Sequence, residues 1–109
     1  MAYAAIANEG KLMKPYIVEE IIHPDGRQEK TDPTMIRQVI TNQTAQTLSA
    51  MLASVVKYGH AQRAGVHGYY IAGKTGTAQV ADSETGKYSI DKSIHSFVGF
   101  APVQDPKFV

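Results

Sequence analysis

Residues 69–78 read Tyr-Tyr-Ile-Ala-Gly-Lys-Thr-Gly-Thr-Ala, and this stretch decides how the rest of the chain is interpreted. Its apolar start predicts a strand that carries Lys74, Thr75, Gly76 and Thr77. Because side chains alternate along a strand, Lys74 and Gly76 are expected on one face and the two threonines on the other. Gly76 has no Cβ, so the backbone of another molecule can approach closely there. A cation, two hydroxyls and free amides suit an anionic, peptide-like ligand that adds along a sheet edge.

Composition excludes several classes of function. The chain has 109 residues, of which 43% are hydrophobic and 19% charged, which is typical of one globular domain or part of a larger one. A formal net charge of +1 predicts no general affinity for nucleic acid. The absence of cysteine excludes disulfides, thiolate catalysis and cysteine-based zinc sites. No apolar stretch reaches the roughly 20 residues that span a bilayer. No metal site is expected, because the histidines lack metal-ligand spacing: His23, His60, His67 and His95.

The remaining chain predicts a mixed α+β fold. An alanine-rich stretch predicts a short helix over residues 2–8, and a longer helix is expected over 42–58. Tyr69 and Tyr70 would alternate across their strand, one packed in the core and one at the surface. A loop is expected at 31–35. β-Branched runs between turn signals predict the strands of one antiparallel sheet, near 15–23, 27–30, 68–80 and 94–101.

The stretch 42–58 has the clearest helical pattern. Thr41 or Thr44 is expected to cap its start, and Gly59 its end. An apolar stripe needs a cover, so we expect this helix to lie on one face of the sheet. The stripe consists of apolar side chains three and four residues apart: Leu48, Met51, Leu52, Val55 and Val56.

Two known patterns overlap at Lys74. The first is Gly68-x-x-x-x-Gly73-Lys74-Thr75, which matches the phosphate-binding loop of nucleotide-binding proteins. That loop needs a strand before it, small flexible residues inside it and a helix after it. Here the interior is bulky and turn residues follow, so nucleotide binding is only an alternative interpretation.

The second pattern is Lys-Thr-Gly on a strand, a signature of penicillin-binding proteins and serine β-lactamases. The stretch Ile71-Ala-Gly-Lys-Thr-Gly-Thr-Ala-Gln79 closely resembles the corresponding strand of class B penicillin-binding proteins, the transpeptidases that cross-link peptidoglycan. Further parts of the chain are similar to that family in the same order: residues 4–10, 15–18, 51–59 and 96–102. The resemblance implies an antiparallel sheet covered by helix, as part of a penicillin-binding and serine β-lactamase-like transpeptidase domain.

The resemblance covers only one of the family's three signatures. The family places its nucleophile in an upstream Ser-x-x-Lys, followed by Ser-x-Asn, and this chain has no Ser-x-Asn. Ser54-Val-Val-Lys57 and Ser89-Ile-Asp-Lys92 fit the first pattern but stand in the wrong place and order, so we interpret both as chance matches. Residues 1–109 are therefore expected to be a fragment of one transpeptidase domain, its Lys-Thr-Gly half, and to be inactive alone.

The resemblance also implies roles for the central residues. Lys74 would add positive potential and a hydrogen bond toward the serine of the absent Ser-x-Asn. Thr75 and Thr77 would bind the substrate carboxylate, and the Thr77 N–H would be one oxyanion donor. Gly76 would leave room for the substrate backbone. The implied catalytic residues are Lys74 and Thr77. The implied substrate-binding residues are Lys74, Thr75, Gly76 and Thr77.

The implied setting is a bacterial cell wall enzyme. Its ligands would be peptidoglycan stem peptides and β-lactams, bound together with the rest of the domain, and no cofactor is implied. The longer protein would be anchored by an upstream helix with this domain outside the cytoplasmic membrane, among division or elongation machinery. An uncovered sheet face makes a dimer or a swapped oligomer of the fragment possible. A non-catalytic interaction module on the same fold is the main alternative.

Overall fold

The strand that carries Lys74 pairs with the segment that follows it in the chain. The computed structural model describes residues 1–83 and 85–109, and every side chain in these ranges except that of Ile90. β5 (Ala72–Ala81) and β6 (Tyr88–Phe100) form a long antiparallel hairpin. This antiparallel pairing agrees with the antiparallel strands predicted near 68–80 and 94–101.

The longer predicted helix is confirmed with both of its expected ends. α2 spans Asn42–Tyr58 and packs against β5. The Thr41 hydroxyl caps the start, accepting a hydrogen bond from the Thr44 N–H at 3.1 Å. At the other end the Gly59 N–H donates to the Val55 carbonyl at 3.0 Å.

The apolar stripe of α2 is confirmed except at Met51. Val56 is buried, and Leu48, Leu52 and Val55 are partly buried. Met51 was expected to be covered, but it is 61% exposed. Ala45, which the predicted stripe did not include, is also buried.

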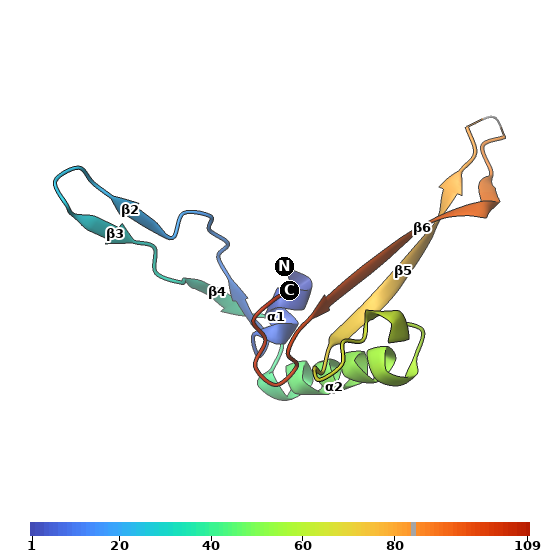
Figure 1. Ribbon diagram of the computed structural model, residues 1–109, viewed down its shortest axis with the longest axis horizontal. Coiled ribbons are helices and arrows are strands. Elements are labelled where there is room, and N and C mark those ends of the chain that lie inside the picture. Colours follow the sequence, from blue (N-terminus) through green and yellow to red (C-terminus); the bar gives the residue numbers. More distant parts are fainter. Residues whose placement is uncertain (84) are drawn as a thin grey trace.

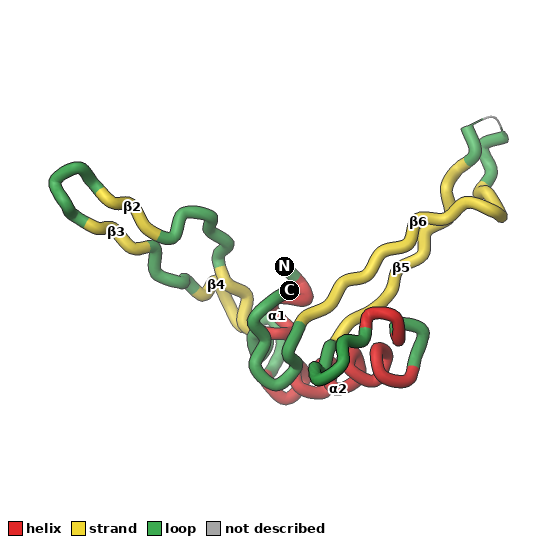
Figure 2. Tube along the Cα trace, in the orientation of Figure 1, coloured by secondary structure: helices red, strands yellow, loops and turns green. Residues whose placement is uncertain are grey.

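The strands do not join into the single sheet that was predicted. In the part of the chain that the structure describes, they form three separate two-stranded antiparallel sheets (Figure 2). Alongside the β5–β6 hairpin, β2 (Glu20–Ile22) pairs with β3 (Gln28–Lys30). The third sheet pairs β1 (Lys11–Met13) with β4 (Met35–Gln38), next to the short helix α1 (Ala2–Ala7). The antiparallel α+β class is confirmed, but the arrangement of its strands differs.

Several predicted bounds were wrong. Only Glu20–Ile22 of the strand predicted at 15–23 is a strand, and the loop expected at 31–35 ends in β4. The strand predicted at 94–101 begins six residues earlier, in a polar segment. The strand predicted at 68–80 begins at Ala72, because a turn precedes it, in which the Tyr69 N–H donates to the Val66 carbonyl at 3.1 Å. Tyr69 and Tyr70 are consequently both exposed, at 63% and 57%.

The chain has an open shape. The β2–β3 hairpin and the β5–β6 hairpin project in different directions from a base formed by α1 and α2 (Figure 1). The radius of gyration is 18.9 Å, whereas a compact domain of this length has about 13 Å. The β2–β3 hairpin and the residues that lead into it, here called the β2–β3 arm, leave apolar side chains uncovered. Ile17 in this arm is fully exposed. No helix of the described residues has the length and apolar character of a membrane span.

Candidate active site

The four central residues lie in the first half of β5, distributed as the alternation predicts. Lys74 pairs with Val98 and Gly76 with Ser96 on one face of the hairpin. Thr75 pairs with Phe97 on the other face, and Thr77 shares that face. The ladder is regular here, since its register shifts only between Gln79 and Ala81.

One edge of β5 is free, and the main-chain groups of Thr75 and Thr77 lie on it. The N–H and carbonyl of Ala101 bond residues 107–108 and not β5, so Ala101 points away from the hairpin interior. Orientation repeats every second residue, so Gly99, Phe97 and His95 point away as well, and so do their partners on β5. No third strand among the described residues pairs with this edge. Thr75 and Thr77 therefore present N–H and carbonyl groups that no strand of the described residues pairs with.

The Lys74 ammonium lies over the same edge. Its Nζ donates to the Thr75 carbonyl at 2.8 Å, although the Lys74 side chain starts on the opposite face from Thr75. The side chain is exposed, and it is absent from the ion pairs of the described residues. Among the described residues this positive charge therefore has no carboxylate partner, and it lies beside outward-facing amides.

A Cβ added at either of two glycines of β5 would meet atoms of β6. A Cβ on Gly73 would collide with the Phe97 ring and would lie 2.8 Å from the Val98 carbonyl. A Cβ on Gly76 would lie 2.6 Å from Ser96 Oγ, with Ser96 Cβ next at 4.0 Å. Gly73 is thus constrained by backbone and ring, whereas Gly76 meets only the tip of one small side chain.

His95 lies at the site, although the sequence identified it only as one of four scattered histidines. It is the cross-strand partner of Thr77, and its Nδ1 lies 3.4 Å from Thr77 Oγ1. Its Nε2 lies 3.0 Å from Ser93 Oγ. Only the hairpin register could have identified it. The sequence alone does not fix how many residues the turn contains, so it does not fix this register.

The chance interpretation of the two Ser-x-x-Lys matches agrees with their surroundings. Ser54 Oγ donates to the Ala50 carbonyl at 3.0 Å within α2, and Ser89 Oγ accepts from the Lys92 N–H at 3.1 Å. A side-chain hydrogen bond with Tyr58 raises the pKa of Lys57, and electrostatic attraction to the phenols of Tyr58 and Tyr70 adds to this effect. A lysine that activates a serine as general base needs a lowered pKa.

The phosphate-loop alternative lacks its helix. Residues Ala72–Ala81 form one continuous strand, so no helix N-terminus follows Gly73 and Lys74. The first turn of a helix supplies the amides that hold phosphate in such loops. This part of the chain therefore has no geometry for nucleotide binding.

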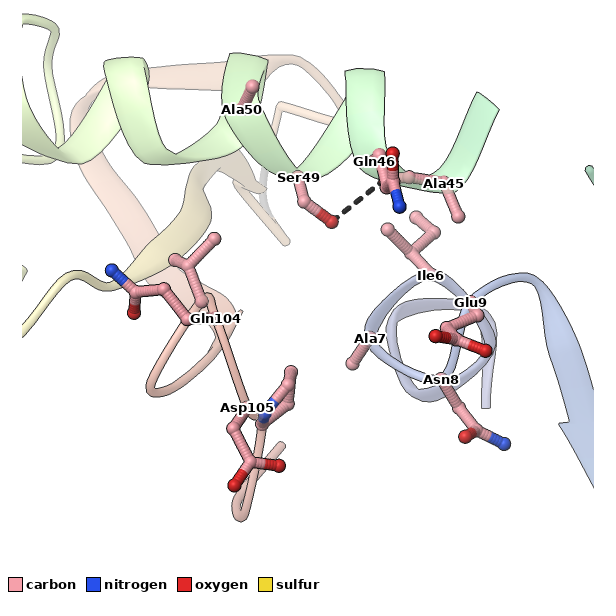
Figure 3. A pocket seen from close by; sticks show the side chains of 12 residues that line it. Ile6, Ala7, Asn8, Glu9, Ala45, Gln46, Ser49, Ala50, Gln104 and Asp105 are labelled. Carbon is pink, nitrogen blue, oxygen red and sulfur yellow. Dashed lines mark hydrogen bonds between the residues drawn. The ribbon is translucent and has the colours of Figure 1, made fainter. Parts of the chain in front are cut away.

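A pocket lies away from β5, between α1, α2 and residues 103–106 (Figure 3). Its volume is about 460 Å³. The carboxylates at its rim already have partners, since Glu9 pairs with Lys11 at 2.8 Å and Asp105 with Lys107 at 2.6 Å. None of the four central residues lines it, so the candidate site is an exposed strand edge and not an enclosed cavity.

The comparison with known families gives a clear result. The model of the penicillin-binding protein transpeptidase domain matches residues 1–109. The chain belongs to the penicillin-binding protein transpeptidase family. Stage V sporulation protein D of Bacillus subtilis is 42% identical over 110 residues, which cover 99% of this chain and 17% of that protein. Penicillin-binding protein PbpB of Mycobacterium tuberculosis is 42% identical over 115 residues, covering 98% of this chain and 17% of that protein.

Solved transpeptidase structures share the fold. The D,D-transpeptidase domain of a peptidoglycan glycosyltransferase from Eggerthella lenta has a TM-score of 0.83 and 33% identity, over 98% of this chain and 24% of that one. Penicillin-binding protein 3 from Mycobacterium tuberculosis, complexed with aztreonam, has a TM-score of 0.82 and 39% identity, over 95% of this chain and 25% of that one. These matches confirm the resemblance to part of a class B transpeptidase domain.

Proposed function

We propose that this chain supplies the Lys-Thr-Gly half of the active site of a peptidoglycan D,D-transpeptidase. The observation that carries the proposal is the free edge of β5, where the Lys74 ammonium and the outward N–H groups of Thr75 and Thr77 lie together. A cation and amides on an unpaired strand suit an extended peptide that ends in a carboxylate. The terminal D-alanyl-D-alanine of a stem peptide is such a ligand.

In this proposal each group has one task. The Thr77 N–H donates to the oxyanion that develops on the scissile carbonyl when a serine attacks it. The hydroxyls of Thr75 and Thr77 hold the substrate carboxylate, and Lys74 adds positive potential and a hydrogen bond toward the second serine motif. Gly76 leaves the strand bare where the substrate backbone lies against it.

The nucleophile comes from outside these residues. The serine attacks the peptide carbonyl, D-alanine leaves with the proton that general acid catalysis provides, and an amine of a second stem peptide resolves the acyl-enzyme. β-Lactams acylate the same serine. The chain spans 17% of the length of each of the two curated relatives named above, in keeping with a longer protein. In this proposal the longer protein is a membrane-anchored acyltransferase with an extracytoplasmic catalytic domain. It acts in division or elongation. The chain alone is inactive.

The uncovered apolar surface of the β2–β3 arm fits the same proposal. Ile17 and Ile22 are 100% and 66% exposed, which is unusual for a domain that is stable by itself. The rest of the longer protein covers this arm. In the isolated chain, the arm instead favours dimers or strand exchange.

The experiment is acylation of the full-length protein by benzylpenicillin, with Thr77 changed in two ways. Thr77→Ser keeps the hydroxyl and is expected to retain the acylation rate within a few-fold. Thr77→Val keeps the branched shape without the hydroxyl, and it is expected to slow acylation by about tenfold, the value of a hydrogen bond to a charged group. Equal rates for both variants would contradict the role of Thr77. Absence of acylation in the unaltered protein would contradict the proposed function itself.

A further inference from the structure

The ring of His95 lies between two hydroxyls on the Thr77 face of the hairpin. Its Nδ1 is 3.4 Å from Thr77 Oγ1, and its Nε2 is 3.0 Å from Ser93 Oγ. Thr77 and His95 are directly opposite across β5 and β6. His95 is exposed, so solvent reaches its ring.

The protonation of this ring decides what the Thr77 hydroxyl can do. A neutral imidazole has one N–H and one acceptor nitrogen. When Nε2 carries the proton and donates to Ser93, Nδ1 accepts from Thr77 and occupies the only proton of that hydroxyl. When the ring is cationic, both nitrogens donate. Nδ1–H then donates to Thr77 Oγ1, and the hydroxyl proton is free for another acceptor.

We propose that His95 is a positioning residue for Thr77: its cationic form turns the Thr77 hydroxyl proton toward the carboxylate of the bound acyl donor. This inference rests on the proposed function, in which Thr77 binds that carboxylate. The positive ring also lies on the same face as the hydroxyl. The charge of the ring and the turned hydroxyl proton therefore both favour binding of the carboxylate. Ligand carboxylates are therefore held more tightly when the His95 ring is cationic than when it is neutral.

The groups that face the ring from the two strands are neutral. From β5 the facing group is the Thr77 hydroxyl, and from β6 it is the Ser93 hydroxyl. The Lys74 side chain starts on the opposite face of β5, with its ammonium over the strand edge at the Thr75 carbonyl, and Lys92 is on the opposite face of β6 by the strand alternation. Asp91 is four residues along β6, roughly 13 Å at the rise of a strand, beyond the Debye length of physiological salt.

The test compares pH profiles of acylation in the full-length protein and in its His95→Asn variant. Asparagine keeps a polar side chain at this exposed position but has no titratable group. The measured quantity is the ratio of the second-order acylation rate constants, because other titrating groups cancel in it. With benzylpenicillin, we expect this ratio to rise about fivefold from about pH 8 to about pH 5.5.

Two controls make the result specific. The methyl ester of benzylpenicillin has no carboxylate, so the ratio should not change with pH. His67→Asn removes an exposed histidine away from β5 and should give the profile of the unaltered protein. A flat ratio with benzylpenicillin, or the same rise with the ester, would overturn the inference about His95. Failure of the unaltered protein to be acylated at any pH would instead overturn the proposed function.

Discussion

The space above Gly76 gives a quantitative test of the hairpin geometry. In Gly76→Ala the new Cβ would lie 2.6 Å from Ser96 Oγ, closer than real contacts allow. The next atom is Ser96 Cβ at 4.0 Å, which is an ordinary contact. Ser96→Ala removes the Oγ and should therefore make room for the alanine at position 76.

The expected energies follow from these contacts. Overpacking costs about 1–3 kcal/mol, and the lower value applies because Ser96 Oγ can rotate away. Replacing a strand glycine by alanine stabilises by about 0.5–1 kcal/mol through the unfolded chain. Gly76→Ala alone should therefore leave the protein neutral or up to about 0.5 kcal/mol less stable. Ser96→Ala should change little, and in that background Gly76→Ala should be stabilising, a coupling energy of about 1 kcal/mol.

The assay is urea unfolding of the two single variants and the double variant, with benzylpenicillin acylation measured on the same proteins. The double variant should regain stability but not acylation, since the alanine still occupies the space proposed for the substrate backbone. Strict additivity of the two substitutions would refute the close approach of Ser96 to Gly76. Recovery of acylation with stability would show that Gly76 serves packing and not substrate access.

Three further predictions concern other parts of the chain. Thr41→Ala should lower the free energy of unfolding by about 1 kcal/mol, because the Thr44 N–H loses its capping partner, whereas Thr41→Ser should be nearly neutral in urea unfolding. Lys74→Gln should slow benzylpenicillin acylation by about 10- to 100-fold, with partial activity in Lys74→Arg, and an unchanged rate would contradict the role of the charge. The Arg27 side chain and N–H hold the pKa of Asp25 below its usual range. The stability that the Asp25 carboxylate contributes is therefore present above the pKa of Asp25 in the unfolded chain, and it is lost as pH falls through the lower pKa of the folded state. Carbon-detected NMR titration of Arg27→Gln should show the Asp25 pKa rising, and an unchanged midpoint would contradict this pairing.

Local features of the sequence were sufficient to predict the parts that position the site. The ends of α2 were predictable because Thr41 and Gly59 act on their own neighbours in the chain. The strand character of Lys74–Thr77 was predictable because the pattern and the following turn both favour a hairpin. The positions of Lys74 and Thr75 on opposite faces followed from alternation alone.

The missed features depend on contacts between distant or uncertainly aligned segments. β1 and β4 are short and pair across more than twenty residues, so neither has a local signal. The contact between Thr77 and His95 depends on register, and a slip of one residue would place His95 on the other face. Met51 was misjudged because the apolar pattern alone does not show which side of the stripe is covered, and α2 buries Ala45 and Val56.

The central claim is that residues 1–109 form half of a transpeptidase site whose serine lies elsewhere. Intact-mass spectrometry after incubation with benzylpenicillin tests it directly, on the full-length protein and on the isolated chain shown to be folded. The account predicts one covalent adduct on the full-length protein, mapped by peptide analysis to a serine outside this chain, and none on the chain alone. An adduct on the isolated chain, with Ser54 or Ser89 as the first serines to map, would contradict it.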